Sequence, residues 1–243
     1  MNTMSAAVAA AVIGARHLRI PRNGQDAAAA WANDGLAAAV VCDGCSAGAS
    51  SELGARLGAQ IAIAALRREL SGSSASRVWP AVRERLVAEL TRLVDAMPGD
   101  RDQIIHDHFL FTIVAVARRG DEAAVWAIGD GGYGFGDRAR VLGPFADNQP
   151  PYLGYELLGA RPDDHLEVAD AACGSAIVAT DGVAELGLER FSGSRWFAHP
   201  DALRRQLAVL ARASERIDWG ARTIVRRPAE LQDDGAVAMV RWR

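Results

Sequence analysis

The chain has 243 residues, of which 50% are hydrophobic and 23% charged, and its formal net charge is −3. This composition excludes a disordered chain and fits one folded domain, which we expect to span residues 1–243. All 27 basic residues are arginine, which excludes Schiff-base catalysis by lysine and the lysine-dependent phosphate-binding loop. The slightly acidic balance gives no general attraction to nucleic acid or to an anionic membrane, so we expect neither as a partner.

The cysteines and the N-terminal segment bear on the compartment. Cys42, Cys45 and Cys173 are an odd number of cysteines and do not suggest a disulfide scaffold, so a reducing cytoplasm is expected. The apolar segment 6–13 follows no basic residue and is shorter than the roughly 20 residues that a membrane span requires. We interpret it as part of a strand and expect neither a signal peptide nor a membrane anchor.

The N-terminal part of the chain predicts three strands followed by two helices. The strands are expected at residues 8–20, 26–32 and 36–42, and the last of them ends at Asp43-Gly44. A helix capped by Ser50 or Ser51 is expected to run to about Leu70, because apolar residues recur at helical spacing. A second amphipathic helix is expected from about Arg77 to about Met97.

From Phe109 onward the hydrophobic pattern changes to that of strands. Three short runs separated by turn residues predict an antiparallel meander, with Gly129-Asp130-Gly131 as a hairpin turn; the runs are 109–119, 122–130 and 131–142. A surface excursion, a strand, a helix and a closing strand are then expected at 143–159, 175–182, 200–213 and 235–242, in that order. Because the strands are grouped and do not alternate with helices, the pattern favours an α+β fold with antiparallel sheets.

Aspartates recur where the predicted strands stop or start. Asp43, Asp130 and Asp181 each end a strand, Asp26 opens one, and the pair Asp233-Asp234 precedes the last strand. Aspartate is common in turns, but several carboxylates gathered at one end of a sheet repel each other unless hard cations neutralise them. The recurrence of Asp-Gly and Asp-Asp at these positions therefore predicts a divalent metal site with oxygen ligands.

The ordered series of motifs resembles the metal-dependent protein phosphatases of the protein phosphatase 2C (PPM) family, particularly its shorter bacterial branch. The motifs are GARH (14–17), RNGQDA (22–27), VVCDGCSAGASSELGARLGA (40–59), HFLFTIVAV (108–116), AIGDGGYGF (127–135), VATDGVAEL (178–186) and QDDGAVAMV (232–240). The resemblance implies a central sandwich of two antiparallel β-sheets flanked by helices, a four-layer α-β-β-α arrangement. This agrees with the fold class predicted from the grouping of strands.

The same resemblance implies a set of metal ligands. Asp43 matches the family's aspartate that bridges two metals, and Gly44 matches its backbone carbonyl ligand. Asp181 and Asp233 match the remaining carboxylate ligands, with Asp233 chosen over its neighbour because the family's ligand precedes a position that is often asparagine. Asp26 matches an acid that orients metal-bound water.

Two further acids match a third metal site of many bacterial members. Asp107 lies at one position of that site, and Glu185 lies where a partner aspartate is common. Because a glutamate replaces that aspartate, the sequence leaves open whether a third ion binds. Asp130 matches a structural aspartate and is not expected to bind metal. The expected cofactors are two Mg²⁺ or Mn²⁺ ions, which oxygen ligands suit better than zinc.

The expected activity is hydrolysis of phosphoserine and phosphothreonine in proteins, in bacterial signalling. Two ions about 3.5–4 Å apart share a bridging water, lower its pKa and present it to the phosphoester. The expected partner is a phosphoprotein, such as the target of a cognate serine/threonine kinase, and the substrate class rests on the resemblance.

The sequence also departs from the family. Cys45 stands where many members have a histidine thought to protonate the leaving group. The family's phosphate-binding arginine is expected at position 21, which is Pro21 here, so Arg22 and His17 become the candidates for substrate phosphate. These departures leave open an alternative, a phosphatase-like regulatory or binding module with little or no turnover.

A second alternative is an α/β-hydrolase esterase. Residues 44–48 fit the G-x-S-x-G pattern with Ser46 as nucleophile, and Asp181 and His199 follow in the order of a catalytic triad. The consecutive strands of 109–142 do not alternate with helices, and Asp43 has no role in such an enzyme. Cys42 and Cys45 also form a C-x-x-C pattern, but no second pair completes a zinc site, and we interpret them as buried small side chains.

Overall fold

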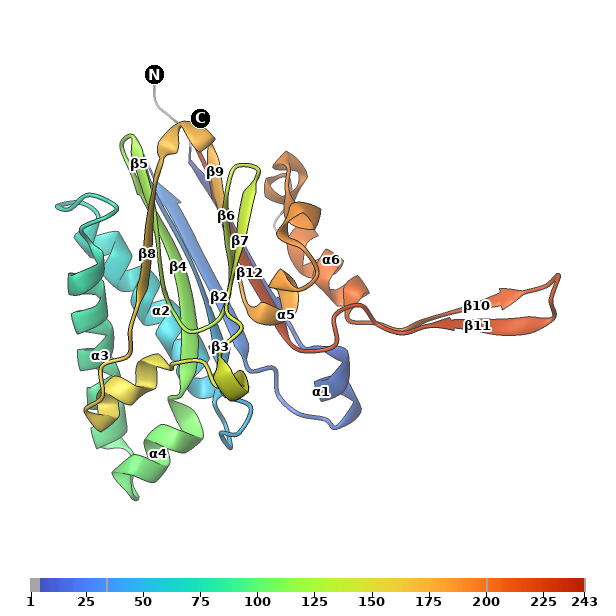
Figure 1. The fold of residues 1–243 in the computed structure, drawn as a ribbon, viewed down its shortest axis with the longest axis horizontal. Coiled ribbons are helices and arrows are strands. Elements are labelled where there is room, and N and C mark those ends of the chain that lie inside the picture. Colours follow the sequence, from blue (N-terminus) through green and yellow to red (C-terminus); the bar gives the residue numbers. More distant parts are fainter. Residues whose placement is uncertain (1–4, 34, 200, 243) are drawn as a thin grey trace.

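The computed structural model describes residues 5–33, 35–199 and 201–242, and these form an α+β sandwich (Figure 1). Sheet A contains, in spatial order, β1 (Ala6–Val12), β12 (Gly235–Arg241), β9 (Ser175–Ala179), β6 (Gly131–Phe135) and β7 (Arg138–Leu142). Sheet B contains β2 (Asp26–Asn33), β3 (Leu36–Gly44), β4 (Phe111–Arg119), β5 (Glu122–Ile128) and β8 (His165–Asp170). All strand pairs in both sheets are antiparallel.

Helices cover the outer face of each sheet. The helices α2 (Glu52–Glu69) and α3 (Trp79–Ala96) share a hydrophobic core with sheet B, and α4 (Arg101–His108) follows them. On the other side, α5 (Asp181–Ala184) and α6 (Ala202–Leu210) pack on sheet A. The predicted four-layer α-β-β-α arrangement is confirmed. No helix in the described ranges is long and apolar enough to cross a bilayer.

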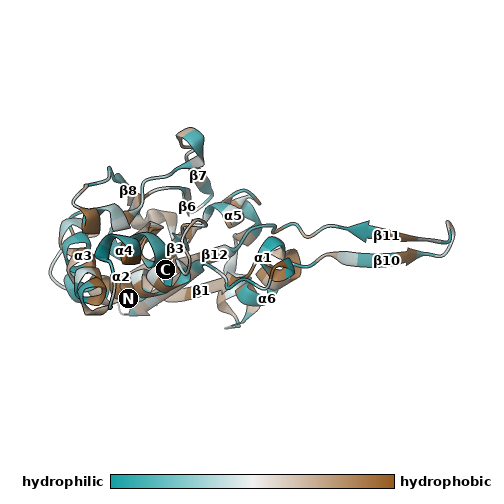
Figure 2. Ribbon diagram, turned by 90° about the horizontal axis from the view of Figure 1, so that it is seen from below, coloured by the Kyte–Doolittle hydropathy of each residue, from teal (hydrophilic) through white to brown (hydrophobic). Residues whose placement is uncertain are grey.

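Short 3₁₀ helices and one further α-helix connect these elements. The α-helix is α1 (Ala15–Arg19), and the 3₁₀ helices are η1 (Ala146–Asn148), η2 (Leu153–Leu158), η3 (Ala171–Cys173), η4 (Leu188–Phe191) and η5 (Ser194–Phe197). A separate two-stranded hairpin, β10 (Ser214–Asp218) and β11 (Thr223–Arg227), extends away from the sandwich (Figures 1 and 2).

The continuous apolar run of β3 follows from its position between two layers. Val40 packs in the core shared with α2 and α3, whereas its neighbour Val41 packs between the two sheets. Since successive side chains point to opposite faces of a strand, both faces are covered and neither accommodates polar residues. The strand therefore keeps its apolar character until Asp43, where it reaches the end of the sandwich.

The predicted strand at 8–20 is wrong in its second half. Strand β1 ends at Val12, and residues 15–19 form the helix α1. The backbone N–H of Gly14 donates to Asp234, and those of Ala15 and Arg16 donate to the carbonyls of residues 231 and 232. These contacts with the distant C-terminal segment turn the chain out of the sheet, and the local pattern of residues 8–20 does not contain them.

The predicted single meander is also corrected by the structure. Strands β4 and β5 lie in sheet B, whereas β6 and β7 lie in sheet A, so Gly129-Asp130 crosses between the sheets and is not a hairpin turn. Gly129 and Gly131 have φ values of +93° and +127°, a backbone region that side chains with a Cβ rarely adopt. The glycines are thus explained by the crossing.

Some elements have no counterpart in the predicted series. Helix α4 begins after Asp100, whose side chain accepts a hydrogen bond from the N–H of Gln103. Strands β8, β10 and β11 escape prediction because charged residues interrupt their apolar pattern. The expected helix at 200–213 corresponds to α6, and Pro200 lies outside the described residues.

Candidate metal centre

A cavity of about 550 Å³ lies where several strands of both sheets begin or end. Its lining includes seven aspartates, and no arginine or histidine of the described residues joins them; the aspartates are Asp26, Asp43, Asp130, Asp147, Asp181, Asp233 and Asp234. The carboxylates come from segments far apart in the sequence. This gathering of negative charge without a basic side chain marks the cavity as a site for cations.

Asp26 and Asp43 form the centre of the cluster. They are direct partners across the β2–β3 ladder, at the start of one strand and near the end of the other. Asp26 is buried and accepts a hydrogen bond of 2.6 Å from the hydroxyl of Thr180, which precedes α5. The hydroxyl fixes one oxygen of Asp26 and links this aspartate to the segment that carries Asp181.

The surroundings of these carboxyls disfavour their ionised form. Burial and the nearby negative charges raise the pKa of both Asp26 and Asp43 well above the ordinary value. Burial and the charge of Asp181 raise the pKa of Asp130 to about 6. A divalent cation among these oxygens would lower these pKa values again, because it favours the charged form of each carboxyl.

Asp181 and Asp233 approach the same cavity from sheet A. Asp181 is the first residue of α5, and one of its oxygens accepts a hydrogen bond from the N–H of Gly182. Asp233 lies just before β12, and one of its oxygens accepts a hydrogen bond from the N–H of Asp234. Both carboxylates keep an oxygen that is available to a ligand.

Asp234 has a different role from its neighbour. Its buried carboxylate accepts hydrogen bonds from the backbone N–H groups of Gly14 and Gln25, at 2.8 and 2.6 Å, and lies 2.8 Å from Nδ1 of His17. One candidate grouping of metal-ligand atoms consists of His17, Asp233 and Asp234, within 4.8 Å of one another. Because hydrogen bonds already occupy Asp234, we interpret that grouping as a tie between α1 and the C-terminal segment, and Asp233 as the acid that is free for metal.

The two residues expected to contact substrate phosphate do not line the cavity. His17 is buried against Asp234. The Arg22 guanidinium donates to the backbone carbonyls of Ser46 and Gly48, both at 2.9 Å, and so supports the loop that follows Asp43. Gln25 supports the same loop through a hydrogen bond of 3.2 Å to the carbonyl of Cys45.

The acids expected at a third metal site also lie outside the cavity lining. The carboxylate of Asp107 on α4 accepts a hydrogen bond of 2.8 Å from Gln103. Glu185 follows α5 and is exposed. The two acids remain a prediction for a third ion.

Arg16 is a candidate that the sequence reasoning missed. It is exposed, and its Nη1 lies 4.0 Å from a carboxylate oxygen of Asp233. Asp233 lines the cavity and Arg16 does not, so we refer to the position of Arg16 as the rim. Arg16 stands next to His17 in the GARH motif, so the motif contained the signal, whereas the family's spacing pointed to position 21 and Arg22 was the nearest arginine.

The excursion at 143–159 forms one wall of the cavity, through Asp147, Tyr152 and Tyr155. Burial raises the pKa of Tyr152, so its hydroxyl stays protonated. The excursion is held in place by Arg83 of α3, which is buried. The guanidinium of Arg83 donates to Glu156, to Asp164 at 2.9 Å and to the carbonyl of Pro162 at 2.8 Å.

The esterase alternative is not supported by the arrangement of its three residues. Ser46 is exposed beside the aspartates, whereas His199 contacts Arg205 and the backbone of Asp201 near α6. An α/β-hydrolase also needs a mostly parallel sheet, and every strand pair here is antiparallel. Cys42 is buried in the core, as expected for a small apolar side chain. The same expectation is wrong for Cys45, which is half-buried and lines the cavity.

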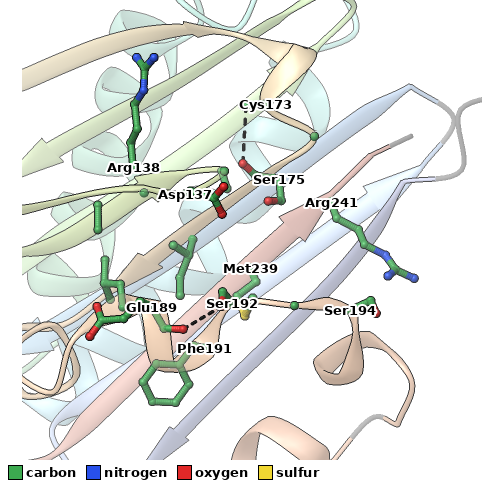
Figure 3. A pocket seen from close by; sticks show the side chains of 18 of the residues that line it. Asp137, Arg138, Cys173, Ser175, Glu189, Phe191, Ser192, Ser194, Met239 and Arg241 are labelled. Atoms are coloured by element: carbon green, nitrogen blue, oxygen red, sulfur yellow. Dashed lines mark hydrogen bonds between the residues drawn. The ribbon is translucent and has the colours of Figure 1, made fainter.

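A second cavity, of about 480 Å³, lies on the outer face of sheet A beneath η4 and η5 (Figure 3). Its lining includes Ile177 of β9, Phe191 of η4 and Met239 of β12. The charged side chains of Arg138 and Arg241 lie at its margins (Figure 3). The acids among the described residues that line it are two, against seven in the first cavity. We therefore place the candidate metal centre in the first cavity.

Comparison with known families agrees with this geometry. Residues 13–221 match the model of the protein phosphatase 2C family. A search of curated protein sequences finds no match.

Solved structures with the same fold include phosphatases of bacteria. The catalytic domain of the serine/threonine phosphatase PstP, in complex with two manganese ions, has 16% identity and a TM-score of 0.59, with 99% of each chain covered. PppA of Pseudomonas aeruginosa has 18% identity and a TM-score of 0.63, covering 100% of this chain and 99% of its own. Stp1 of Staphylococcus aureus has 11% identity and a TM-score of 0.61, covering 99% and 96%. At these identities the likeness shows a shared fold.

Proposed function

This chain belongs to the protein phosphatase 2C family, and from that premise we propose that it is a metal-dependent phosphatase acting on phosphoserine and phosphothreonine in proteins. The observation that carries the proposal is the cavity with seven aspartates and no basic side chain among the described residues that line it. Phosphate is an anion and would be repelled by such a cavity unless cations were bound there first.

The donor set fits hard divalent ions. Carboxylates and a backbone carbonyl are the ligands that Mg²⁺ and Mn²⁺ prefer. Burial and the charges of neighbouring aspartates raise the pKa of Asp26 and Asp43, and bound cations would offset both effects. The residues that would hold the ions are Asp43, the Gly44 carbonyl, Asp181 and Asp233. The presence of two manganese ions in PstP supports a count of two, with Asp107 and Glu185 as candidates for a third.

Bound divalent ions would supply the positive charge that neutralises the phosphoryl oxygens and activates a water for attack. Asp26, whose orientation is fixed by Thr180, would accept a hydrogen bond from the attacking water and align it. Arg16 at the rim would contact an oxygen of the incoming phosphate. Since no histidine lines the described part of the cavity, we assign the proton for the leaving group to solvent.

The substrate would be a phosphoprotein, such as the target of a serine/threonine kinase in a bacterial signalling pathway. Ser46 and Ala47 line the cavity and are exposed, so a phosphorylated side chain can approach past this loop. The three free cysteines support a reducing, cytoplasmic setting.

The test is hydrolysis of p-nitrophenyl phosphate and of a phosphothreonine peptide in Mn²⁺, in Mg²⁺ and in EDTA. We expect turnover that depends on metal and falls by at least about 10³-fold in Asp43→Asn, since the substitution removes the central charged ligand. The matched control is Asp147→Asn, an aspartate of the same cavity that is not a proposed ligand, which should stay within about fivefold of the wild type.

Two outcomes would contradict the phosphatase proposal. Equal rates for Asp43→Asn and wild type would remove the metal centre from the mechanism. A wild-type chain that is stabilised by Mn²⁺ but hydrolyses neither substrate would instead support the alternative, a phosphatase-like regulatory module, which is suggested by the replacement of the usual histidine by Cys45.

A further inference from the structure

The β10–β11 hairpin is an arm that stands apart from the rest of the described molecule. It extends away from the sandwich in both views (Figures 1 and 2). The sandwich and the helices that cover it are called the body below. The base of the arm is fixed to the body, because the N–H groups of Glu230 and Leu231 both donate to the carbonyl of Leu210 at the end of α6. Along the described chain, no third strand pairs with the outer edge of β10 or of β11.

The arm exposes apolar surface. Ile217 and Ile224 are direct partners across the hairpin and so lie on the same face, where they are 51% and 55% exposed. Trp219 follows at the tip and is 80% exposed. Figure 2 shows hydrophobic residues on both strands near the outer end of the arm. A two-stranded hairpin alone is only marginally stable in water, and further strands or a packed face are needed to order it.

The two outer edges differ in charge. Strand β11 contains Arg226 and Arg227 and no acid, whereas β10 contains both Arg216 and Asp218. Glu215 is already paired with Arg226 at 2.9 Å across the hairpin, and within the described ranges Arg216 has no ion-pair partner. One oxygen of Asp218 accepts a hydrogen bond from the N–H of Ala221 in the turn, which leaves its other oxygen free.

The sequence of β10 is complementary to itself when two copies run antiparallel. If Ile217 of one copy lies opposite Ile217 of the other, then Arg216 of each lies opposite Asp218 of the other, because residues equally far from the centre become partners. The pairing forms two opposite-charge cross-strand pairs on one face. On the other face it joins the exposed isoleucines of both hairpins into one apolar surface. The edge of β11 offers no such match, since its arginines would find no acid.

We propose that two copies of this chain associate through the outer edges of their β10 strands, forming a four-stranded antiparallel sheet about a two-fold axis at Ile217. The interface is isologous, so it uses the edge of β10 once in each copy and closes at a dimer. The backbone groups on the outer edge of β10 gain partners, because an unpaired edge strand offers its N–H and C=O groups to another strand. The proposal concerns assembly and does not depend on phosphatase activity.

The test is analytical ultracentrifugation of the full chain over a range of protein concentrations. We expect a monomer–dimer equilibrium for the wild type. Arg216→Glu replaces two attractive pairs by two repulsive ones and should raise the dissociation constant at least about tenfold. Arg227→Glu makes the same change of charge on the other strand of the same arm and is the matched control, with a dissociation constant close to that of the wild type.

A third variant removes the arm without touching the sandwich. Replacement of residues 214–227 by a short Gly-Ser loop should give a monomer at all concentrations, with the far-ultraviolet circular dichroism of the body retained. A monomeric wild type, a dimer that survives loss of the arm, or equal weakening by Arg216→Glu and Arg227→Glu would each overturn the proposal.

Discussion

The body and the arm of this molecule differ in how far their strands and charged groups are buried. Strand β4 is buried along nearly its whole length, between a helix layer and a second sheet, whereas β10 is largely exposed. The charged groups differ in the same way, since burial raises the pKa of Asp26 and Asp43 at the cavity, whereas the arginines of the arm are exposed to solvent. The two regions therefore differ in what we expect them to bind. The buried carboxyls of the cavity require cations, whereas the exposed edge of the arm can pair with a strand of another copy.

The largest expected effect is the loss of stability when an isoleucine of the body is replaced by alanine, compared with the same replacement in the arm. Ile113 of β4 is fully buried, and Ile113→Ala should lower the free energy of unfolding by about 2–5 kcal/mol, because it leaves a cavity in the core. Ile217→Ala on the arm should change it by less than about 0.5 kcal/mol at concentrations where the chain is monomeric. Chemical denaturation of both variants measures the difference, and similar losses would show that the arm packs on the body in solution.

The second expected effect concerns pH and metal. The folded-state pKa values of Asp26 and Asp43 lie above their unfolded values, so their contribution to stability is present at low pH and is lost as the pH rises through the folded pKa. Asn at position 43 carries no charge at any pH and removes the repulsion from Asp26. In EDTA, the gain in melting temperature of Asp43→Asn over wild type should therefore grow between about pH 5 and about pH 8.

Mn²⁺ should remove the pH dependence of the difference in melting temperature between Asp43→Asn and the wild type. Metal binds the folded state and not the unfolded state, so it should stabilise the wild type by about 2.7 kcal/mol at a concentration 100 times the dissociation constant of one site. Asp43→Asn should gain much less. Calorimetry with and without Mn²⁺ measures the melting temperatures of the wild type and the variant. A difference between them that does not change with pH in EDTA would mean that the carboxyls of Asp26 and Asp43 do not repel each other.

The smallest expected effect compares two exposed arginines. Arg16→Ala should raise KM for p-nitrophenyl phosphate by about fivefold with little change in kcat, since a rim contact to phosphate is worth about 1 kcal/mol. Arg216→Ala on the arm removes the same charge far from the cavity and should leave both constants unchanged. Steady-state kinetics separate the two, and equal effects would indicate that only the net charge of the molecule matters.

The cavity was the more predictable of the two regions. Asp43, Asp181 and Asp233 each follow or precede a strongly apolar segment, and the structure brings all three to one cavity. The ends of buried strands are visible in a sequence because apolar runs stop there. The place of Arg16 at the rim and of Asp130 between the sheets could not be predicted, since they depend on α1 and on the crossing from sheet B to sheet A.

The arm was not predictable from local pattern. Residues 214–227 carry no predicted element because their strands have no buried face, and without burial there is no alternation of apolar and polar residues to detect. The helix α1 escapes prediction for a related reason, because Asp234, 220 residues beyond Gly14, holds its first turn.

By itself, the sequence determined the α+β class, the grouping of strands and the acids at their ends, since each of these follows from apolar runs and the residues that stop them. Only the tertiary structure decided which carboxylate is free for a ligand, which arginine lies at the rim and which strands stand apart from the body. Those features depend on contacts between distant segments: Asp234 is occupied because Gly14, His17 and Gln25 fold onto it, and Asp233 is left available as a result.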